Sequence, residues 1–277
     1  MSRFGTPGGG SGAPPIRLGV VGASGRMGRA IVRLARDAGM EIACAVGTTD
    51  VGRDAGELAG LGGIGVAVTD AIEALATAKV SVCIEFSTPA GTRAAAELAA
   101  RAGFALVSGT TGLDAPATYA LDDAAQTVPV LWEPNMSVGV HVLGVLVRRA
   151  IEMLGPSFDV EIVEAHHRLK ADAPSGTAMR LAEIARAARG DDPQLVHGRH
   201  GRPGARPAAE IGIHAVRGGD VVGDHTVSLL GAGERIELVH RASSRDLFAH
   251  GAVVAACWLH GRPSGRYGLR DVVGSTS

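Results

Sequence analysis

A glycine-rich segment near the N-terminus, VVGASGRMGRA over residues 20–30, constrains the fold of this 277-residue chain more than any other feature. It follows a short apolar run, residues 16–21, which is typical of a buried parallel strand. A predicted helix over residues 26–38 begins within it, because apolar side chains recur there with helical spacing. Glycines at such a turn let the chain bend tightly and let a pyrophosphate approach the helix N-terminus. They are Gly22, Gly25 and Gly28.

The spacing of these glycines, G-x-x-G-x-x-G, differs from the usual G-x-G-x-x-G. A strand–helix turn without a ligand is therefore the alternative interpretation. The position of the turn, between the first predicted strand and the first predicted helix, favours a dinucleotide. Further predicted strands span residues 41–46, 66–69, 80–86, 104–108 and 128–132, and further predicted helices span 90–102 and 114–126. This alternation predicts an α/β fold with a Rossmann-like, doubly wound parallel sheet.

The pattern changes after Asn135. A long amphipathic helix is expected first, then a strand, a second helix, a Gly/Pro/Arg-rich loop and three runs of alternating apolar residues. The turns Gly-Gly-Asp and Gly-Ala-Gly between these runs are typical of hairpins, so we expect a second α+β domain with a mixed or antiparallel sheet. The corresponding ranges are 138–154, 159–165, 177–189, 190–208, 211–217, 225–231 and 235–241.

These elements predict two domains. Residues 16–136 and 246–277 form a dinucleotide-binding domain, because the last helix, 246–260, is apolar enough to pack back on the first half. Residues 137–245 form a substrate-binding and oligomerisation domain. Residues 1–15 are Gly/Ser/Pro-rich, lack the apolar core of a signal peptide, and are expected to be a disordered tail.

Composition excludes several function classes. The net charge is −1 and aromatic residues make up 3% of the chain, which argues against a nucleic-acid partner. The apolar runs are too short to span a membrane. Cys44, Cys83 and Cys257 lie far apart in apolar runs without CxxC spacing. We therefore expect no metal site, three buried thiols and a cytoplasmic location.

Two further loops follow predicted strands, where parallel sheets bind ligands. VSGTTG contains Gly109, Thr110 and Thr111, which offer backbone N–H groups and hydroxyls, and EPNM contains Glu133, Pro134, Asn135 and Met136. Each loop on its own is equally consistent with ordinary turn chemistry. Together with the glycine-rich turn, they predict one cofactor cleft.

The second strand ends without the acidic residue that usually binds the adenosine ribose of NAD. Gly47 occupies that position, and Thr48 and Thr49 follow. Asp50 favours NADH if it turns inward, whereas Arg53 lies close enough to approach a 2′-phosphate. With neither a clear acid nor a clear base at the strand end, we expect the protein to use NADH or NADPH.

The segment EAHHRLKADAPSGTA, residues 164–178, gathers titratable groups and a helix start. His166 suits a proton donor, because imidazole is the most frequent general acid and base in proteins, while His167 and Lys170 suit a carboxylate-bearing substrate. Ser175, Gly176 and Thr177 open a helix whose N–H groups attract anions. The alternative is an ordinary helix cap beside one core and one surface histidine. A shared zinc ion is disfavoured because adjacent strand residues point to opposite faces.

This segment, together with the nucleotide-binding pattern and HRASSR at 240–245, resembles the dihydrodipicolinate reductase family over about residues 16–273. The resemblance implies reduction by NAD(P)H of (2S,4S)-4-hydroxy-2,3,4,5-tetrahydrodipicolinate, a cyclic dicarboxylate, in diaminopimelate and lysine biosynthesis. It also implies a homotetramer built through the sheet of the second domain.

By the same resemblance, His166 is a proton donor or acceptor, Lys170 is a second catalytic proton donor, and His167, Gly176 and Thr177 contact the substrate. It also implies cofactor contacts at Gly22, Ala23, Ser24, Gly25, Arg26 and Met27, and at residues 109–111 and 133–136. From their positions alone, we expect Ser175 at the helix start to contact the substrate and Thr48 after the second strand to contact the cofactor. Two other functions share part of this pattern: a different two-domain NAD(P)-dependent dehydrogenase acting on a small carboxylate, and a non-catalytic redox sensor that binds NAD(H). Neither requires His166 and Lys170 together.

Overall fold

The computed structural model describes residues 16–190 and 192–274, so the tail predicted for residues 1–15 lies outside the described residues. Internal contacts divide the chain into two units. The first runs up to Ser137 and resumes at Asp246, and the second is Val138–Arg245. The prediction of a Rossmann-like parallel sheet and a second, mixed sheet is confirmed.

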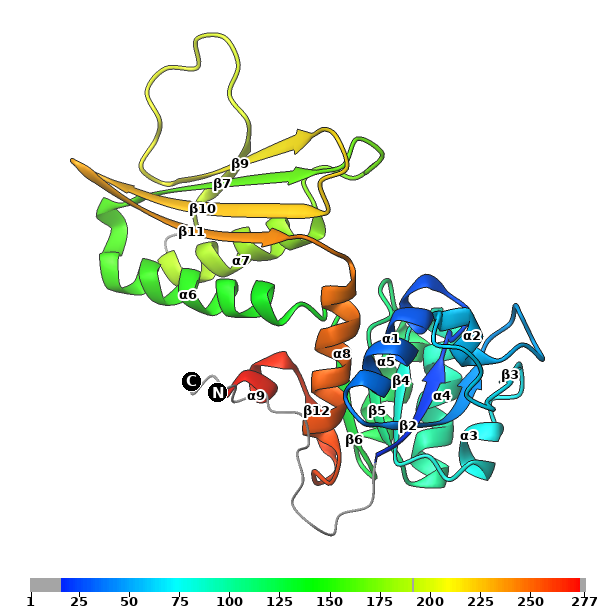
Figure 1. The fold of residues 1–277 in the computed structure, drawn as a ribbon. Helices are drawn as coiled ribbons and strands as arrows, with labels where there is room; N and C mark the ends of the chain where they lie inside the picture. The colour runs from blue at the N-terminus through cyan, green and yellow to red at the C-terminus, as the bar shows by residue number, and fades with distance from the viewer. Residues whose placement is uncertain (1–15, 191, 275–277) are drawn as a thin grey trace. The chain divides into compact units, whose positions relative to one another are not determined.

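The first unit contains a sheet of seven parallel strands in the order β12-β6-β5-β4-β1-β2-β3 (Figure 1). The order reverses between β1 and β4, which is the switch point where such sheets bind ligands outside the carboxyl ends of their strands. The strands are β1 Arg17–Val21, β2 Glu41–Val46, β3 Val68–Thr69, β4 Val82–Glu85, β5 Ala105–Ser108, β6 Pro129–Trp132 and β12 Gly265–Tyr267. The last of these was not predicted.

Helices pack on this sheet from segments far apart in the chain. Contacts of α8 with α1 and with the neighbouring strands β4 and β5 bring the C-terminal segment back to the first half. Capping residues begin α4 and α5, since the side chains of Thr88 and Asp114 accept backbone N–H bonds there. The helices are α1 Arg26–Asp37, α2 Ala55–Ala59, α3 Ala74–Thr77, α4 Pro89–Ala102, α5 Ala115–Ala124, α8 Asp246–Leu259 and α9 Leu269–Val273.

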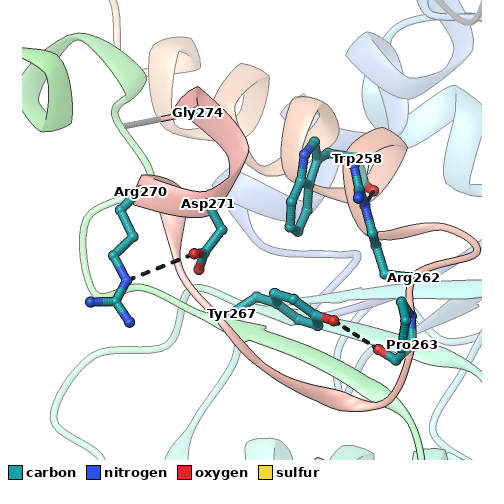
Figure 2. Close-up of a pocket in the computed structure, with 7 residues that line it drawn as sticks. All are labelled: Trp258, Arg262, Pro263, Tyr267, Arg270, Asp271 and Gly274. Atoms are coloured by element: carbon teal, nitrogen blue, oxygen red, sulfur yellow. Dashed lines mark hydrogen bonds and ion pairs between the residues drawn. The ribbon is translucent and has the colours of Figure 1, made fainter. Parts of the chain in front are cut away.

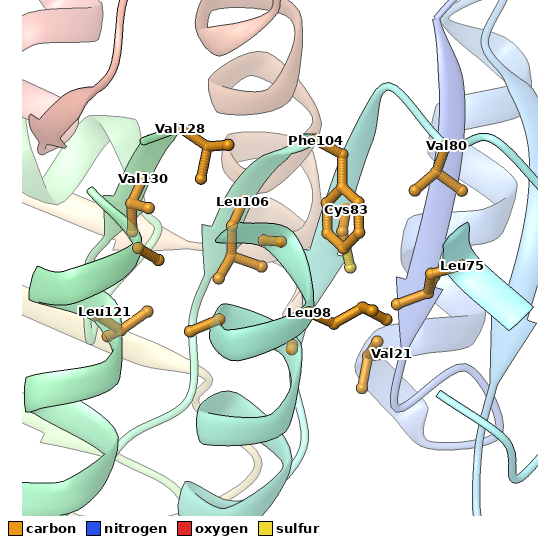
Figure 3. Packing of buried hydrophobic residues seen from close by; sticks show 14 of the residues in the cluster. Val21, Leu75, Val80, Cys83, Leu98, Phe104, Leu106, Leu121, Val128 and Val130 are labelled. Atoms are coloured by element: carbon orange, nitrogen blue, oxygen red, sulfur yellow. The ribbon is translucent and has the colours of Figure 1, made fainter. Parts of the chain in front are cut away.

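The core between α4, α5 and the strands is closely packed and apolar (Figure 3). Phe104, Leu106 and Leu121 are fully or almost fully buried there. Of the three cysteines, Cys44 and Cys83 are buried as predicted, whereas Cys257 is only partly buried. Burial raises the pKa of Cys44 to about 11, so this thiol stays protonated at neutral pH.

The second unit contains a five-stranded mixed sheet in the order β11-β10-β7-β9-β8. Two helices cover one face of this sheet (Figure 1), and apolar side chains from both layers form its core. The strands are β7 Asp159–His166, β8 Gln194–His197, β9 Glu210–Arg217, β10 Gly223–Gly231 and β11 Glu234–Ala242. The helices are α6 Val138–Leu154 and α7 Gly176–Arg189, with a 3₁₀ turn at Gly155–Ser157.

One predicted hairpin is wrong. The strands on either side of Gly-Gly-Asp, β9 and β10, are not neighbours, because β7 lies between them and pairs with both. Turn residues predict that the chain changes direction, but they do not predict whether an earlier strand lies between the two strands that they connect. The hairpin between β10 and β11 is confirmed by their antiparallel pairing.

The predicted loop 190–208 contains a strand, β8, which pairs with the edge of β9. Its side chains are exposed or only half-buried, so it lacks the apolar pattern that marks an interior strand. The rest of the loop is anchored to β7, because Arg199 and Arg206 both bind the Glu161 carboxylate. Burial alone would raise the pKa of Glu161, but hydrogen bonds from both arginines and His214 lower it to about 2.

Candidate functional site

The glycine-rich turn closes tightly against the end of β2. The backbone N–H groups of Gly22 and Ala23 both donate to the Val46 carbonyl at 2.9 Å. Gly22 has a φ of +83°, and a Cβ added to Gly28 would lie 2.1 Å from the Gly22 oxygen. No side chain caps the N-terminus of α1. This bare, closely packed helix start fits a pyrophosphate.

The end of β2 packs against the glycine-rich turn. A Cβ at Gly47 would lie 2.4 Å from Ser24 Oγ, so a side chain at this position would require the Ser24 hydroxyl to rotate away. Thr48 is exposed just beyond it. The carboxylate of Asp50 binds Arg29 and Arg53, each at 2.9 Å. The acid and the base considered at this edge are therefore paired with each other.

A buried carboxyl group connects the loops that follow β4 and β5. Glu85 is fully buried, and each of its oxygens accepts two hydroxyl hydrogen bonds, at 2.6 to 2.8 Å. The four donors are Ser87, Thr92, Ser108 and Thr110. The Thr110 hydroxyl also accepts from the Ser87 N–H at 2.9 Å. This hydroxyl, expected to face the cofactor, has its proton engaged inside the protein. The Gly109 N–H is engaged as well, since it donates to the Glu85 carbonyl at 3.0 Å, which leaves the N–H groups of Thr110 and Thr111 for that role.

The loop after β4 belongs to this edge of the sheet and was not predicted to do so. A Cβ on Gly22 would lie 2.0 Å from the Phe86 carbonyl oxygen, and one on Gly109 would lie 2.1 Å from the Phe86 ring. Phe86 therefore packs between the glycine-rich turn and the loop after β5. The signal was available in the sequence, because residues 80–86, VSVCIEF, form a predicted strand and Phe86 stands at its end.

The loop at residues 133–136 is held by its own side chains and by the C-terminal helices. The Asn135 side chain accepts the Ser137 N–H at 2.9 Å. Glu133 accepts the Leu269 N–H of α9 at 3.4 Å. A Cβ on Gly251 of α8 would lie 1.8 Å from the Met136 oxygen, so helix and loop are in direct contact.

In the second unit, His166 is the last residue of β7 and is 9% exposed. Its Nδ1 lies 2.6 Å from Glu164, which is fully buried. Two nitrogens of Arg217 also bind this carboxylate, each at 2.8 Å, and the Ser175 N–H donates to it at 2.9 Å. Glu164 and Arg217 were not predicted as site residues, because nothing local in the sequence connects them.

The turn after β7 contains two further predicted residues, His167 and Lys170. Lys170 Nζ lies 2.9 Å from Asp172, and Arg245 donates to His167 Nε2 at 3.0 Å. Backbone bonds join this turn to the segment between β9 and β10, as in the 2.7 Å bond from the His167 N–H to the Val221 carbonyl. The Gly-Gly-Asp turn thus supports the histidine pair instead of forming a hairpin.

Ser175, Gly176 and Thr177, which were predicted together as substrate contacts, differ in their surroundings at the N-terminus of α7. Ser175 is buried and caps the helix through the Ala178 N–H, and its own N–H binds Glu164. Gly176 is exposed and Thr177 half-buried. His225 lies beside Ser175, with Nε2 at 3.2 Å from its Oγ. Burial, followed by the charge of His166, lowers the pKa of His225 to about 4, so this ring is neutral at pH 7.

A further pocket in the first unit contains none of the predicted residues (Figure 2). Arg262 lies over the Trp258 ring at 4.2 Å, and the Tyr267 hydroxyl donates to the Pro263 carbonyl at 3.1 Å. Within the described parts of the chain, no helix is long and apolar enough to cross a membrane. Residues 16–190 and 192–274 also contain no cluster of three histidine, cysteine or acidic side chains suited to a metal ion.

Comparison with known proteins assigns the chain to a family. Residues 16–136 match the model of the dihydrodipicolinate reductase N-terminus, and residues 139–273 match that of its C-terminus. The chain belongs to the dihydrodipicolinate reductase family. The two family models meet at about the boundary between the two structural units.

Relatives within the dihydrodipicolinate reductase family cover nearly the whole chain. The 4-hydroxy-tetrahydrodipicolinate reductase of Myxococcus xanthus is 48% identical over 94% of this chain and 98% of its own. That of Anaeromyxobacter dehalogenans strain 2CP-1 is 51% identical, over 92% and 96%. A dipicolinate-bound dihydrodipicolinate reductase from Paenisporosarcina sp. TG-14 has the same fold, with a TM-score of 0.76, 25% identity, and coverage of 92% of this chain and 98% of that one.

Proposed function

We propose that the protein reduces (2S,4S)-4-hydroxy-2,3,4,5-tetrahydrodipicolinate to tetrahydrodipicolinate with NAD(P)H and loss of water, in diaminopimelate and lysine biosynthesis. The observation that carries this proposal is a buried Glu164–His166 pair four residues from Lys170, in a chain whose two halves both match the reductase family. A redox sensor has no need of such a pair.

The substrate is a ring with two carboxylates, and the second unit offers cationic and N–H donors for them. Lys170 and His167 lie in one turn, and Gly176 and Thr177 begin α7, where the helix dipole favours negative charge. Ser175 contributes by capping this helix. Dipicolinate, which the Paenisporosarcina relative binds, is likewise a ring with two carboxylates.

The chemistry requires one hydride and one proton. NAD(P)H, when bound, supplies the hydride, and the glycine-rich turn with residues 109–111 and 133–136 holds the nucleotide. His166 and Lys170 supply the proton to the substrate while water leaves. Incubating the protein with NADPH and with substrate made enzymatically from pyruvate and aspartate semialdehyde tests the proposal. Substrate-dependent loss of the nicotinamide absorbance supports it, and absence of that loss contradicts it.

We expect NADH and NADPH to give kcat/KM values within about tenfold of each other, or roughly 1.4 kcal/mol. The reason is that Asp50 is neutralised by Arg29 and Arg53, so neither a free acid nor a free base selects at the ribose. Asp50→Ala releases both arginines and should shift the ratio toward NADPH. Assays with both cofactors at one fixed salt concentration measure this. A wild-type preference above about a hundredfold, roughly 2.7 kcal/mol, would contradict it.

We also propose a homotetramer assembled through the sheet of the second unit. The side chains of Ile162, Ile213 and Leu238 pack in the core with residues of α6 and α7, so alternate residues of the same strands point to the opposite face. Val163, Val216 and Val239 lie on that opposite face and are exposed at 38%, 50% and 45%. Val163 and Val239 stand in register on either side of Thr226, so all three side chains lie on the same face of the sheet. Exposed apolar faces of sheets are normally covered by a partner.

Light scattering should give four times the 28.1 kDa chain mass. Val239→Glu should reduce that mass, whereas Met153→Glu, which alters an exposed side chain on α6, should not. A stable wild-type monomer at micromolar concentration would rule out the assembly.

We further propose a cytoplasmic location, in keeping with NAD(P)H as reductant and three free thiols.

A further inference from the structure

The Glu164 carboxylate is built as a fixed hydrogen-bond acceptor. It is fully buried, and four donors fill its two oxygens: Arg217 Nη1 and His166 Nδ1 on Oε2, and Arg217 Nη2 and Ser175 N on Oε1. Burial alone would raise the pKa of Glu164, but the bonds from Arg217 and His166 outweigh it and leave the pKa below its usual range. Glu164 is therefore an anion at neutral pH, with no proton to donate.

An acceptor of this kind determines the tautomer of His166. Because Glu164 accepts only, His166 Nδ1 must carry a proton, and in the neutral ring Nε2 is then the bare nitrogen. Gly223 leaves room for that atom, since a Cβ there would lie 3.0 Å from Nε2. The neighbouring His225 ring, 5.3 Å away between centroids, is uncharged at pH 7. A positive charge forming on His166 thus meets an anion and no second imidazolium.

We propose that Glu164, itself anchored by Arg217, is a positioning residue that holds His166 in the Nδ1–H tautomer and stabilises its protonated form during turnover. The effect on turnover rests on the proposed function, whereas the tautomer of His166 is a property of the protein without substrate. It also connects proton transfer to substrate binding, since the Ser175 N–H at the start of α7 shares the same carboxylate.

The decisive variant is Glu164→Gln. One end of the glutamine side chain keeps an oxygen for Ser175 N and Arg217 Nη2, and the other places an NH₂ against His166 Nδ1 and Arg217 Nη1. The flipped amide would place its NH₂ against two fixed donors, Ser175 N and Arg217 Nη2, so the first orientation leaves fewer donors facing donors. Because NH₂ donates only, Nδ1 must become the acceptor and the proton moves to Nε2. By analogy with carboxylate-to-amide changes in catalytic triads, kcat should fall roughly 10²–10⁴-fold. The KM values for NADPH and substrate should change by less than about threefold.

Glu161→Gln is the matched control, because it alters another carboxylate of β7 that binds a histidine and two arginines without contacting His166. It should leave kcat and the His166 tautomer unchanged. The tautomer is read from ¹⁵N shifts of histidine-labelled full-length protein, with the His166 signals identified by their absence in His166→Ala.

Wild-type protein with Nδ1–H and a bare Nε2 supports the proposal, and so does the reversed tautomer in Glu164→Gln. Wild-type protein with Nε2–H overturns it, even if Glu164→Gln fails to fold. An unchanged tautomer in a folded Glu164→Gln also overturns it, whatever its kcat, since any loss of rate would then be structural. If wild-type protein does not turn over the substrate, the proposed function fails while the tautomer result stands.

Discussion

Replacing His166 or Lys170 with alanine is expected to lower kcat roughly 10²–10⁴-fold, the usual effect of removing a positioned proton donor. His166 is held by a buried carboxylate at 2.6 Å, and Lys170 lies in the turn that follows it. Neither side chain belongs to the unit that carries the glycine-rich turn, so NAD(P)H binding should be retained in both variants. Steady-state kinetics and NADPH fluorescence titration measure the two effects separately.

The two variants should differ in KM. Lys170 also binds a substrate carboxylate in this account, so Lys170→Ala should raise KM for the substrate as well as lower kcat. His167→Ala should act mainly on KM. Arg168→Ala, which removes an exposed cation from the same turn, is the matched control and should change both parameters little. Near-normal kcat in both His166→Ala and Lys170→Ala would refute the assignment.

Replacing Gly28 with alanine is expected to weaken NAD(P)H binding more than tenfold, or about 1.4 kcal/mol, and to destabilise the first unit by about 1–3 kcal/mol. The added Cβ would lie 2.1 to 2.7 Å from three backbone atoms of Gly22 and Ala23, and a backbone cannot move aside as a flexible side chain can. Helix α1 would have to shift away from the turn that holds the pyrophosphate.

Gly25→Ala provides the comparison for stability. Gly25 has a φ of −75°, and its added Cβ would lie 3.3 Å from a single atom, the Gly22 oxygen. Thermal unfolding of Gly25→Ala should therefore resemble that of the wild type, while Gly28→Ala unfolds at lower temperature. Equal stability and equal NADPH affinity in Gly28→Ala and wild type would contradict this packing.

Much of the fold follows from local sequence patterns. The glycine-rich turn, strands β1 to β6, helices α1, α4, α5 and α8 of the first unit and the whole of α6 were predictable, because helical and strand periodicity is a property of neighbouring residues. The place of β7 between β9 and β10 was not, because pairing depends on residues about 50 positions apart, such as Val160 and Ile211. The edge strand β8 was not predicted, because its side chains are exposed or half-buried and its sequence therefore lacks an apolar pattern.

The candidate site divides in the same way. His166, Lys170 and the start of α7 stand in one segment whose chemistry is visible in the sequence. The groups that orient them come from elsewhere, since Arg217 lies 53 residues from the Glu164 that it binds. In the first unit, the Glu85 carboxyl group appeared as an ordinary strand residue, and only the fold brings Ser108 and Thr110 to it.

Hydride transfer from the nicotinamide to the cyclic dicarboxylate can be followed by mass spectrometry of the product formed with NADH dideuterated at C4 of the nicotinamide. We expect tetrahydrodipicolinate that carries one deuterium in wild-type reactions, and a rate of labelled product that falls with kcat in His166→Ala and Lys170→Ala. Oxidation of the nicotinamide without deuterium in the product, or no product at all, would contradict this transfer.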